Sequence, residues 1–216
     1  MRLFIALLSG ILLLACAGCN FRSPFRNLSP SPPNSVSWST TPRAIEPMRI
    51  AIVPFTLAER VGKGAVELAP SLAASLRELG LHQVVLVGPE VAAKLITADL
   101  HANSVSVESL HSVRDATNCD AVIVGRVEQF DGYHPISLAV TVHLVSCQDG
   151  AVLWTAQADL DGHRDDIQRD IEGWWSRNRG EATAALNTWR STLESPREFC
   201  KYATDRLAWT IGQLPE

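Results

Sequence analysis

Cysteine is the residue type in this sequence whose spacing points most directly to chemistry. The chain has 216 residues and five cysteines, three of them beyond residue 19. Cys119 and Cys147 flank two predicted strands. If those strands turn around residues 132–135, position 119 falls opposite position 147, within the reach of a disulfide. We therefore predict a Cys119–Cys147 disulfide, with buried free thiols as the alternative, and expect Cys200 to pack against the sheet.

Other polar clusters lack the spacing of a catalytic or metal-binding motif. The acidic stretch 159–166 has its glycine at the fourth position, whereas an EF-hand loop needs one at the sixth. Gly62-Lys63-Gly64 lacks the full spacing of a phosphate-binding loop. None of the six histidines lies in a recognised hydrolase or zinc motif. We expect no enzymatic activity, no metal and no cofactor.

Composition and charge narrow the class of protein. The apolar fraction of 46% and the charged fraction of 19% are those of an ordinary globular protein. They exclude a wholly disordered chain, and five cysteines are too few for a small disulfide scaffold. Nineteen basic residues against 23 acidic ones leave a net charge of −4, with no basic surplus to meet phosphates. We therefore expect no nucleic-acid partner.

The first residues have the layout of an export signal. A basic start is followed by 12 mostly apolar residues at 3–14, fewer than the roughly 20 needed to span a membrane. Small residues then precede two cysteines, as in a bacterial lipobox, where a lipid is attached to the cysteine thiol. The pattern fits Cys16 better than Cys19, which has a cysteine three positions before it. A plain signal peptide or an uncleaved anchor is the alternative.

This interpretation places residues 1–18 in a lipoprotein signal. We expect a chain held on a membrane by its lipid and facing the periplasm, with the outer membrane as its location. The periplasm is oxidising, which favours a persistent disulfide.

Residues 19–47 are predicted to form a tether, because their composition cannot bury a core. They hold six of the 12 prolines, at positions 24, 30, 32, 33, 42 and 47. A coil of this length spans roughly 30 Å on average. Phe21, Phe25 and Trp38 are expected either to contact lipid headgroups or to form a strip that binds a partner.

Residues 48–160 show the pattern of an α/β domain. Apolar runs predict strands at 49–55, 83–87, 120–130, 136–145 and 152–158, and helical periodicity predicts helices at 66–79, from 89 and from 106. Alternation of strands and helices favours parallel pairing of the first three strands, whereas short turns favour an antiparallel meander of the last three. The sequence predicts a mixed five-stranded sheet of order 2-1-3-4-5 with helices on both faces.

The register of the last two strands follows from their apolar rows. A two-residue turn at 149–150 would set those rows on opposite faces of the sheet. A three-residue loop, 148–150, with Gly150 in the left-handed conformation, places Leu144 opposite Trp154 and keeps one buried face. We predict the second register.

Residues 161–216 are predicted to form a helical extension packed on the domain. Helical periodicity covers 165–178 and 182–193, and a capping box begins a last helix at Ser195. Trp174 and Trp175 are adjacent and cannot both face one core. We therefore regard them as candidates for a protein interface.

A ligand crevice is expected at the carboxyl ends of the parallel strands, where the chain order reverses. It would lie between strands 49–55 and 120–130. Its rim residues would be Thr56, Glu59, Arg60, Glu128 and Asp131. A small-ligand or glycan-binding module using this crevice is the alternative function.

The segments Ile50–Phe55, Asp120–Val127 and Asp149–Trp154, after a lipobox and a proline-rich tether, resemble one superfamily of envelope proteins. It contains the periplasmic domain of curli-assembly (CsgG-like) lipoproteins, the amino-terminal domain of TolB, and the lipoprotein activators of penicillin-binding proteins. The resemblance covers about residues 48–160. It implies a non-enzymatic periplasmic adaptor that binds other envelope proteins. The chain lacks the paired amphipathic strands with which curli-type members build a pore, so we do not expect a channel.

Overall fold

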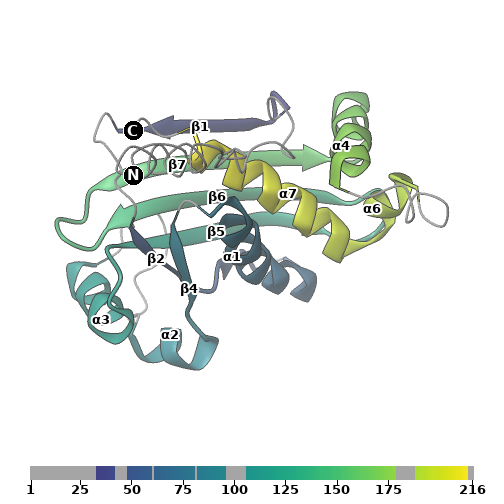
Figure 1. Cartoon of the computed structure of the whole chain (residues 1–216). Helices are drawn as coiled ribbons and strands as arrows, with labels where there is room; N and C mark the ends of the chain where they lie inside the picture. The colour runs from purple at the N-terminus through teal and green to yellow at the C-terminus, as the bar shows by residue number, and fades with distance from the viewer. Residues whose placement is uncertain are drawn as a thin grey trace, which may run out of the picture.

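The structure is a computed structural model that describes residues 33–41, 48–59, 61–80, 82–95, 106–178 and 188–213. The described residues form a mixed α/β fold in which helices pack on both faces of a sheet (Figure 1). The α/β class predicted from the sequence is therefore confirmed. The predictions for Cys16, Cys19 and Arg60, and most of the predicted helix 182–193, lie outside the described residues.

The described sheet has seven strands. They are β1 (Val36–Thr40), β2 (Arg49–Ile52), β3 (Thr56–Leu57), β4 (Gln83–Leu86), β5 (Ala121–Asp131), β6 (Ser137–Ser146) and β7 (Val152–Asp161). Their order is β1-β7-β6-β5-β2-β4, and β3 pairs with β5 beyond the end of β2. β2 pairs in parallel with β4 and β5, while β5, β6 and β7 form an antiparallel meander.

The predicted five-stranded sheet is wrong in its extent, because β1 and β3 extend it to seven strands. β1 comes from residues 36–40, which we assigned to the tether, and pairs antiparallel with β7. Val36 and Trp38 alternate with Ser37 and Ser39, but this pattern covers only five residues within a proline-rich segment, and only Val36 is buried. The place of β1 is set by the free backbone edge of β7, a tertiary effect that local sequence does not report.

One face of the sheet is covered by α1 (Leu68–Leu79), which follows the 3₁₀ turn η2 (Lys63–Glu67), and by α7 (Pro196–Ile211). α7 crosses this face beside α1, and α4 (Asp165–Asn178) lies beyond the end of β7, with the short α6 (Arg190–Glu194) leading into α7 (Figure 1). These helices enclose the larger apolar cluster, which includes the inward rows of β6 and β7.

The second face is covered over only part of its width. α2 (Pro89–Leu95) and α3 (Val107–Thr117) pack over β2 and β5 and enclose a smaller apolar cluster. Over β6 and β7 this face carries half-buried polar side chains instead, and His143 hydrogen-bonds Thr155 with 2.9 Å between Nδ1 and Oγ1. The predicted cover of helices on both faces is therefore confirmed for the β2–β5 half of the sheet.

The register predicted for the last hairpin is confirmed. Leu144 pairs with Trp154 and Val142 with Ala156, and Gly150 has a φ of 70°. A positive φ is accessible to glycine without a side-chain clash, so this turn selects the register that buries both apolar rows on one face.

The predicted helix caps are also present. The Ser106 hydroxyl accepts the amide hydrogen of Ser109, and the Ser195 hydroxyl accepts that of Glu198. Pro196 occupies the first turn of α7, where its missing N–H removes no helical hydrogen bond. Residues 165–178 are helical as predicted.

A buried carboxylate connects three helices. Asp205 on α7 accepts hydrogen bonds from the Ser75 hydroxyl of α1 (2.6 Å) and from the Trp174 indole N–H of α4 (2.8 Å). Burial raises the pKa of Asp205, and these two hydrogen bonds oppose that shift only in part. The ionised carboxylate is therefore costly where it lies, although it orients both partners.

A buried ion pair between Arg206 of α7 and Asp170, one turn before Trp174 on α4, also joins these two helices. Arg206 is fully buried, and its guanidinium contacts the Asp170 carboxylate through Nε (2.7 Å) and Nη2 (3.0 Å). The Tyr202 hydroxyl donates to the same carboxylate at 2.7 Å. Removing Asp170 would leave a buried cation without its counter-charge, which is far more costly than the pair is stabilising.

We predict that Asp205→Asn changes the pH dependence of stability in a defined direction. Because the folded-state pKa of Asp205 is raised, its contribution to stability is complete below its unfolded pKa and is lost as pH rises through the folded value. The unfolding free energy of the parent chain should therefore fall relative to Asp205→Asn as pH rises above about 4, the ordinary pKa of an aspartate. Chemical denaturation across this range measures the difference.

Asp205→Ala is the matched comparison, because alanine removes the carboxylate that accepts from Trp174 and Ser75, although the Ser75 hydroxyl keeps its contacts with Ser71 and Thr204. It should cost about 2 kcal/mol across the range. A parent chain that gains stability over Asp205→Asn as pH rises would contradict this account.

Candidate functional site

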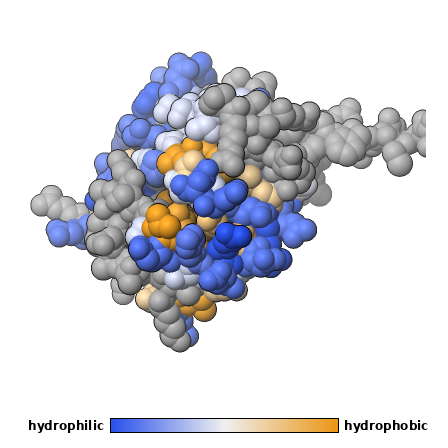
Figure 2. All heavy atoms as spheres, turned by 90° about the vertical axis from the view of Figure 1, so that its left-hand side faces the viewer, coloured by the Kyte–Doolittle hydropathy of each residue, from blue (hydrophilic) through white to orange (hydrophobic). Residues whose placement is uncertain are grey.

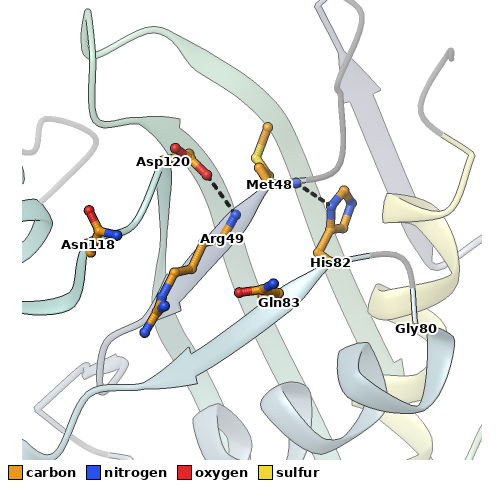
Figure 3. A pocket seen from close by; sticks show the side chains of 7 residues that line it. All are labelled: Met48, Arg49, Gly80, His82, Gln83, Asn118 and Asp120. Atoms are coloured by element: carbon orange, nitrogen blue, oxygen red, sulfur yellow. Dashed lines mark hydrogen bonds between the residues drawn. The ribbon is translucent and has the colours of Figure 1, made fainter.

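A polar pocket lies at the amino ends of the parallel strands. It has a volume of about 450 Å³, and Figure 3 shows its lining. The lining residues come from the starts of β2 and β4, the end of α1 and the segment between α3 and β5; they are Met48, Arg49, Gly80, His82, Gln83, Asn118 and Asp120. The pocket is thus at the opposite end of these strands from the predicted crevice.

Three polar side chains stand in one row across the sheet. Arg49 pairs with Gln83 in the parallel ladder, and Asp120 immediately precedes the β5 residue paired with Ile50. The Asp120 carboxylate accepts the backbone N–H of Arg49 at 2.8 Å, which fixes the loop before β5 against β2. The Arg49 Nε is buried and has no hydrogen-bond partner among the described residues. An unpaired buried donor of this kind is costly unless a ligand or water accepts from it.

A histidine closes the other side of the pocket. The backbone N–H of Met48 donates to His82 Nδ1 at 3.4 Å, so the neutral ring carries its proton on Nε2. Burial lowers the pKa of His82, which keeps the ring neutral at pH 7. The two ionic groups of the lining are then Arg49 and Asp120, whose charges cancel.

This combination suits a small polar ligand without a large net charge. Guanidinium and imidazole N–H groups donate, the carboxylate accepts, and the amides of Gln83 and Asn118 do both. Figure 2 shows the end of the molecule on the left of Figure 1, where β5 begins and the β6–β7 hairpin turns; its surface is largely hydrophilic, with hydrophobic atoms in separate small patches. The pocket therefore selects by hydrogen bonding.

The residues predicted to rim the carboxyl-end crevice take part in contacts of the sheet itself. β3 runs along β5 there, and the Thr56 hydroxyl donates to the Gly125 carbonyl at 3.3 Å. Glu128 pairs with Arg126 at 2.9 Å, and Asp131 accepts the backbone N–H of Tyr133 at 3.0 Å. Glu59 lies in the turn after β3. A ligand in that crevice stays a prediction.

The structure brings the two predicted disulfide cysteines together. Their sulfur atoms lie 3.5 Å apart, and both side chains are buried. The β5–β6 register continues to place Cys147 opposite Asp120, whose carbonyl accepts the Cys147 backbone N–H, so Cys119 lies one position away from the residue that directly faces Cys147. The predicted register, with residue 119 opposite residue 147, is therefore wrong by one residue. The disulfide itself stays a prediction, because both cysteines are thiols in this structure.

The two thiols share a hydrogen bond that separates their acidities. Either sulfur can donate in this contact, and the hydrogen bond with Cys147 lowers the pKa of Cys119 to about 6. The same bond and burial raise the pKa of Cys147. Cys200 lies alone in the larger core, where burial raises its pKa to about 12. Packing of Cys200 in the core agrees with the prediction.

The prediction that Trp174 belongs to an interface is wrong. Its side chain is 1% exposed and points into the core between α4 and α7, where its indole N–H bonds Asp205. Trp175 is half-buried and packs against the edge of that core. The two side chains do face differently, as their adjacency requires, but neither dominates an open surface.

Another tryptophan pair marks an open sheet edge. Trp38 of β1 is 41% exposed, and its ring meets that of Trp209 on α7 edge-on, with 5.6 Å between the ring centroids. β1 is the terminal strand of the sheet, and no described strand pairs with its outer side. The segments 36–40 and 207–213 that carry these two rings contain no charged residue.

Backbone pairing shows which groups of β1 face outwards. Asp159 donates its N–H to the Ser35 carbonyl, and Thr41 donates to the Leu153 carbonyl. In an antiparallel ladder alternate residues exchange hydrogen bonds, so Ser37 and Ser39 also point toward β7. The N–H and C=O groups of Trp38 and Thr40 therefore point away from the sheet.

Several solved structures are similar to part of this chain. The PelC dodecamer from Paraburkholderia phytofirmans has a TM-score of 0.44 and 19% identity, covering 76% of this chain and 96% of that one. Lipoprotein GNA1162 from Neisseria meningitidis has a TM-score of 0.41 and 21% identity, covering 53% and 81%. Escherichia coli LpoB has a TM-score of 0.40 and 11% identity, covering 53% and 56%.

No protein-family model and no curated protein matches the sequence. Within the described ranges no helix is long and apolar enough to cross a membrane.

Neither the pocket nor the edge strand was predicted from the sequence. The pocket had a readable signal, because Arg49, Gln83 and Asp120 each directly precede an apolar run of a predicted parallel strand. Residues in that position share one edge of the sheet. The edge strand had no such signal apart from Trp38, which is unusual in a proline-rich segment.

Proposed function

We propose that this chain is a lipid-anchored envelope protein that acts as a non-enzymatic adaptor, docking an extended segment of another envelope protein on the outer side of β1. The amino-terminal signal and lipobox support anchoring, and the resemblance noted above implies an adaptor role. The observation that carries the proposal is the open edge of β1, where outward backbone groups and the Trp38–Trp209 pair lie side by side.

The edge offers both parts of strand recognition. Outward N–H and C=O groups of Trp38 and Thr40 supply backbone hydrogen bonds to an added strand. The two indole rings supply apolar contact area, and exposed tryptophan is strongly enriched among residues that dominate binding energy. The tether reaches the sheet at this same strand, so the lipid would hold the edge close to other membrane-bound proteins.

The anchoring half of the proposal predicts a specific mature terminus. Mass spectrometry of the protein from membranes should find an acylated cysteine as its first residue, at Cys16 or Cys19. If Cys16 carries the lipid, Cys16→Ser abolishes acylation and Cys19→Ser leaves it intact; the reverse pattern assigns Cys19. An unmodified amino terminus in both the parent chain and the variants contradicts anchoring.

The docking half predicts a position-dependent proline effect. Thr40→Pro removes an outward N–H without removing a ladder bond to β7, so the fold should keep its thermal stability. A photo-crosslinking residue at Ser39 of the full chain in intact envelopes should form protein adducts. Thr40→Pro should reduce them at least roughly fivefold, the effect of losing about 1 kcal/mol.

Thr40→Val is the matched control, because it keeps the N–H and should keep the adducts. As a second control, a crosslinking residue placed at the exposed Glu108 of α3 measures protein adducts that do not involve the β1 edge. Adducts at Ser39 that persist at full yield in Thr40→Pro would refute docking through backbone pairing.

The pocket supports a second candidate function, the binding of a small hydroxylated ligand such as a saccharide unit. The buried, unpartnered Arg49 Nε and the balanced charges of Arg49 and Asp120 favour a neutral ligand whose hydroxyls donate and accept. We therefore propose the amino-end pocket, rather than the predicted crevice, as the site for this small-ligand alternative.

A panel of envelope-derived oligosaccharides tests this candidate. Arg49→Gln keeps the backbone bond to Asp120 but removes the guanidinium, and should weaken binding of any responsive saccharide roughly tenfold. Arg164→Gln, an exposed arginine paired with Asp166, should leave binding unchanged. Equal binding by the parent chain and Arg49→Gln, or no binding in the millimolar range, counts against a saccharide site here.

A further inference from the structure

We infer that Cys119 and Cys147 are joined by a disulfide in the mature protein, and that this bond locks the wall of the amino-end pocket. The inference rests on the proposed export, because it needs an oxidising compartment. It concerns the side of the pocket formed by Asn118 and Asp120, between which Cys119 lies.

The backbone already holds the two cysteines in position. The Cys147 N–H donates to the Asp120 carbonyl at 2.9 Å, and the Asp120 N–H donates to the Arg49 carbonyl at 2.8 Å. The chain segments before β5 and after β6 are thus tied to each other and to β2. With the sulfur atoms 3.5 Å apart, bond formation requires a closure of only about 1.5 Å to reach the usual S–S length of about 2.05 Å.

The surroundings favour a permanent bond over a reactive one. Both side chains are 2% exposed and lie in the smaller apolar cluster with Val122 and Leu110. Reductants of ordinary size cannot reach them without opening the hairpin after β6. Cys200 lies in the other cluster, across the sheet, so it cannot compete for either partner.

The reaction balances as a thiol–disulfide exchange with a protein disulfide donor of the envelope. During folding, the thiolate of one cysteine attacks the donor disulfide and forms a mixed disulfide. The second cysteine loses its proton and attacks the sulfur of the first, releasing the donor as a dithiol. The two thiols lose two protons and two electrons, and the donor disulfide takes up both electrons.

The disulfide would restrain the chain on one side of the pocket. The bond closes a loop between residues 119 and 147, which contains the whole β5–β6 hairpin. It also prevents the Asn118–Asp120 segment from leaving β2, because the segment is held covalently at its centre. The row of Gln83, Arg49 and Asp120 would then keep its spacing whether or not the pocket holds a ligand.

Peptide mapping of the full chain purified without reductant tests the inference. The denatured protein is alkylated and then digested with trypsin, which separates the cysteines into peptides 115–126, 127–164 and 198–201. We expect the first two to be recovered as one linked species, which separates on reduction, and Cys200 to be alkylated. Cys119→Ser should free Cys147 for alkylation, while Cys200→Ser should leave the linked species unchanged.

A stability measurement gives a second readout that does not depend on labelling. Reduction of the parent chain should lower its melting temperature by about 5–10 °C, whereas the Cys119→Ala/Cys147→Val variant should be insensitive to reductant. The valine fills the apolar site, so the variant can be compared as a folded protein.

The outcomes separate this inference from the proposed function. An acylated, membrane-bound chain in which both peptides are fully alkylated overturns the disulfide and leaves anchoring intact. If the protein is instead cytosolic and reduced, the proposed function fails. Oxidation of that purified chain in a glutathione buffer then tests whether the fold holds the two cysteines in position for a disulfide. A link between Cys119 and Cys147 supports the inferred pairing, whereas a link to Cys200 or no link overturns it.

Discussion

The fold depends on one strand, β5, that is buried on both faces where the two halves of the sheet meet. Ile123 faces α1 and α7, whereas Val122 and Val124 face the layer under α2 and α3. Strands β2, β3 and β6 all pair with it, so its register sets theirs. Moving β5 by one residue would exchange its two apolar rows and place each against a layer shaped for the other.

This constraint also decides which surfaces remain for function. A strand buried on both faces must lie in the interior of the sheet, which leaves β1 and β4 as the described edges. Immediately before β5, the segment that follows α3 folds back against the start of β2, where Asp120 contacts Arg49. This contact forms one side of the polar pocket and brings Cys119 close to Cys147. The open edge and the pocket are thus two consequences of the same arrangement, one suited to a protein segment and one to a small ligand.

Elements whose residues alternate between buried and exposed could be predicted from the sequence, whereas elements held in place by tertiary pairing could not. The alternating apolar rows fixed the register at Leu144 and Trp154, and the caps at Ser106 and Ser195 are local hydrogen bonds that residue type reveals. β1 could not be predicted, because it buries one residue and is held by the edge of β7. The polar row of Gln83, Arg49 and Asp120 was not predicted either, because a ligand site was expected at the carboxyl ends of the parallel strands and this row lies at their amino ends.

The proposed docking requires β1 to be a folded edge strand whose outer backbone groups are open. Residue-resolved amide hydrogen exchange of the full, lipid-anchored chain in detergent tests this directly. We predict alternation along the strand, with the amides of Ser37, Ser39 and Thr41 protected and those of Trp38 and Thr40 exchanging at least roughly tenfold faster. Equal protection at all five amides would show that the edge is already paired, and equally fast exchange at all five would show that β1 is not part of the folded sheet.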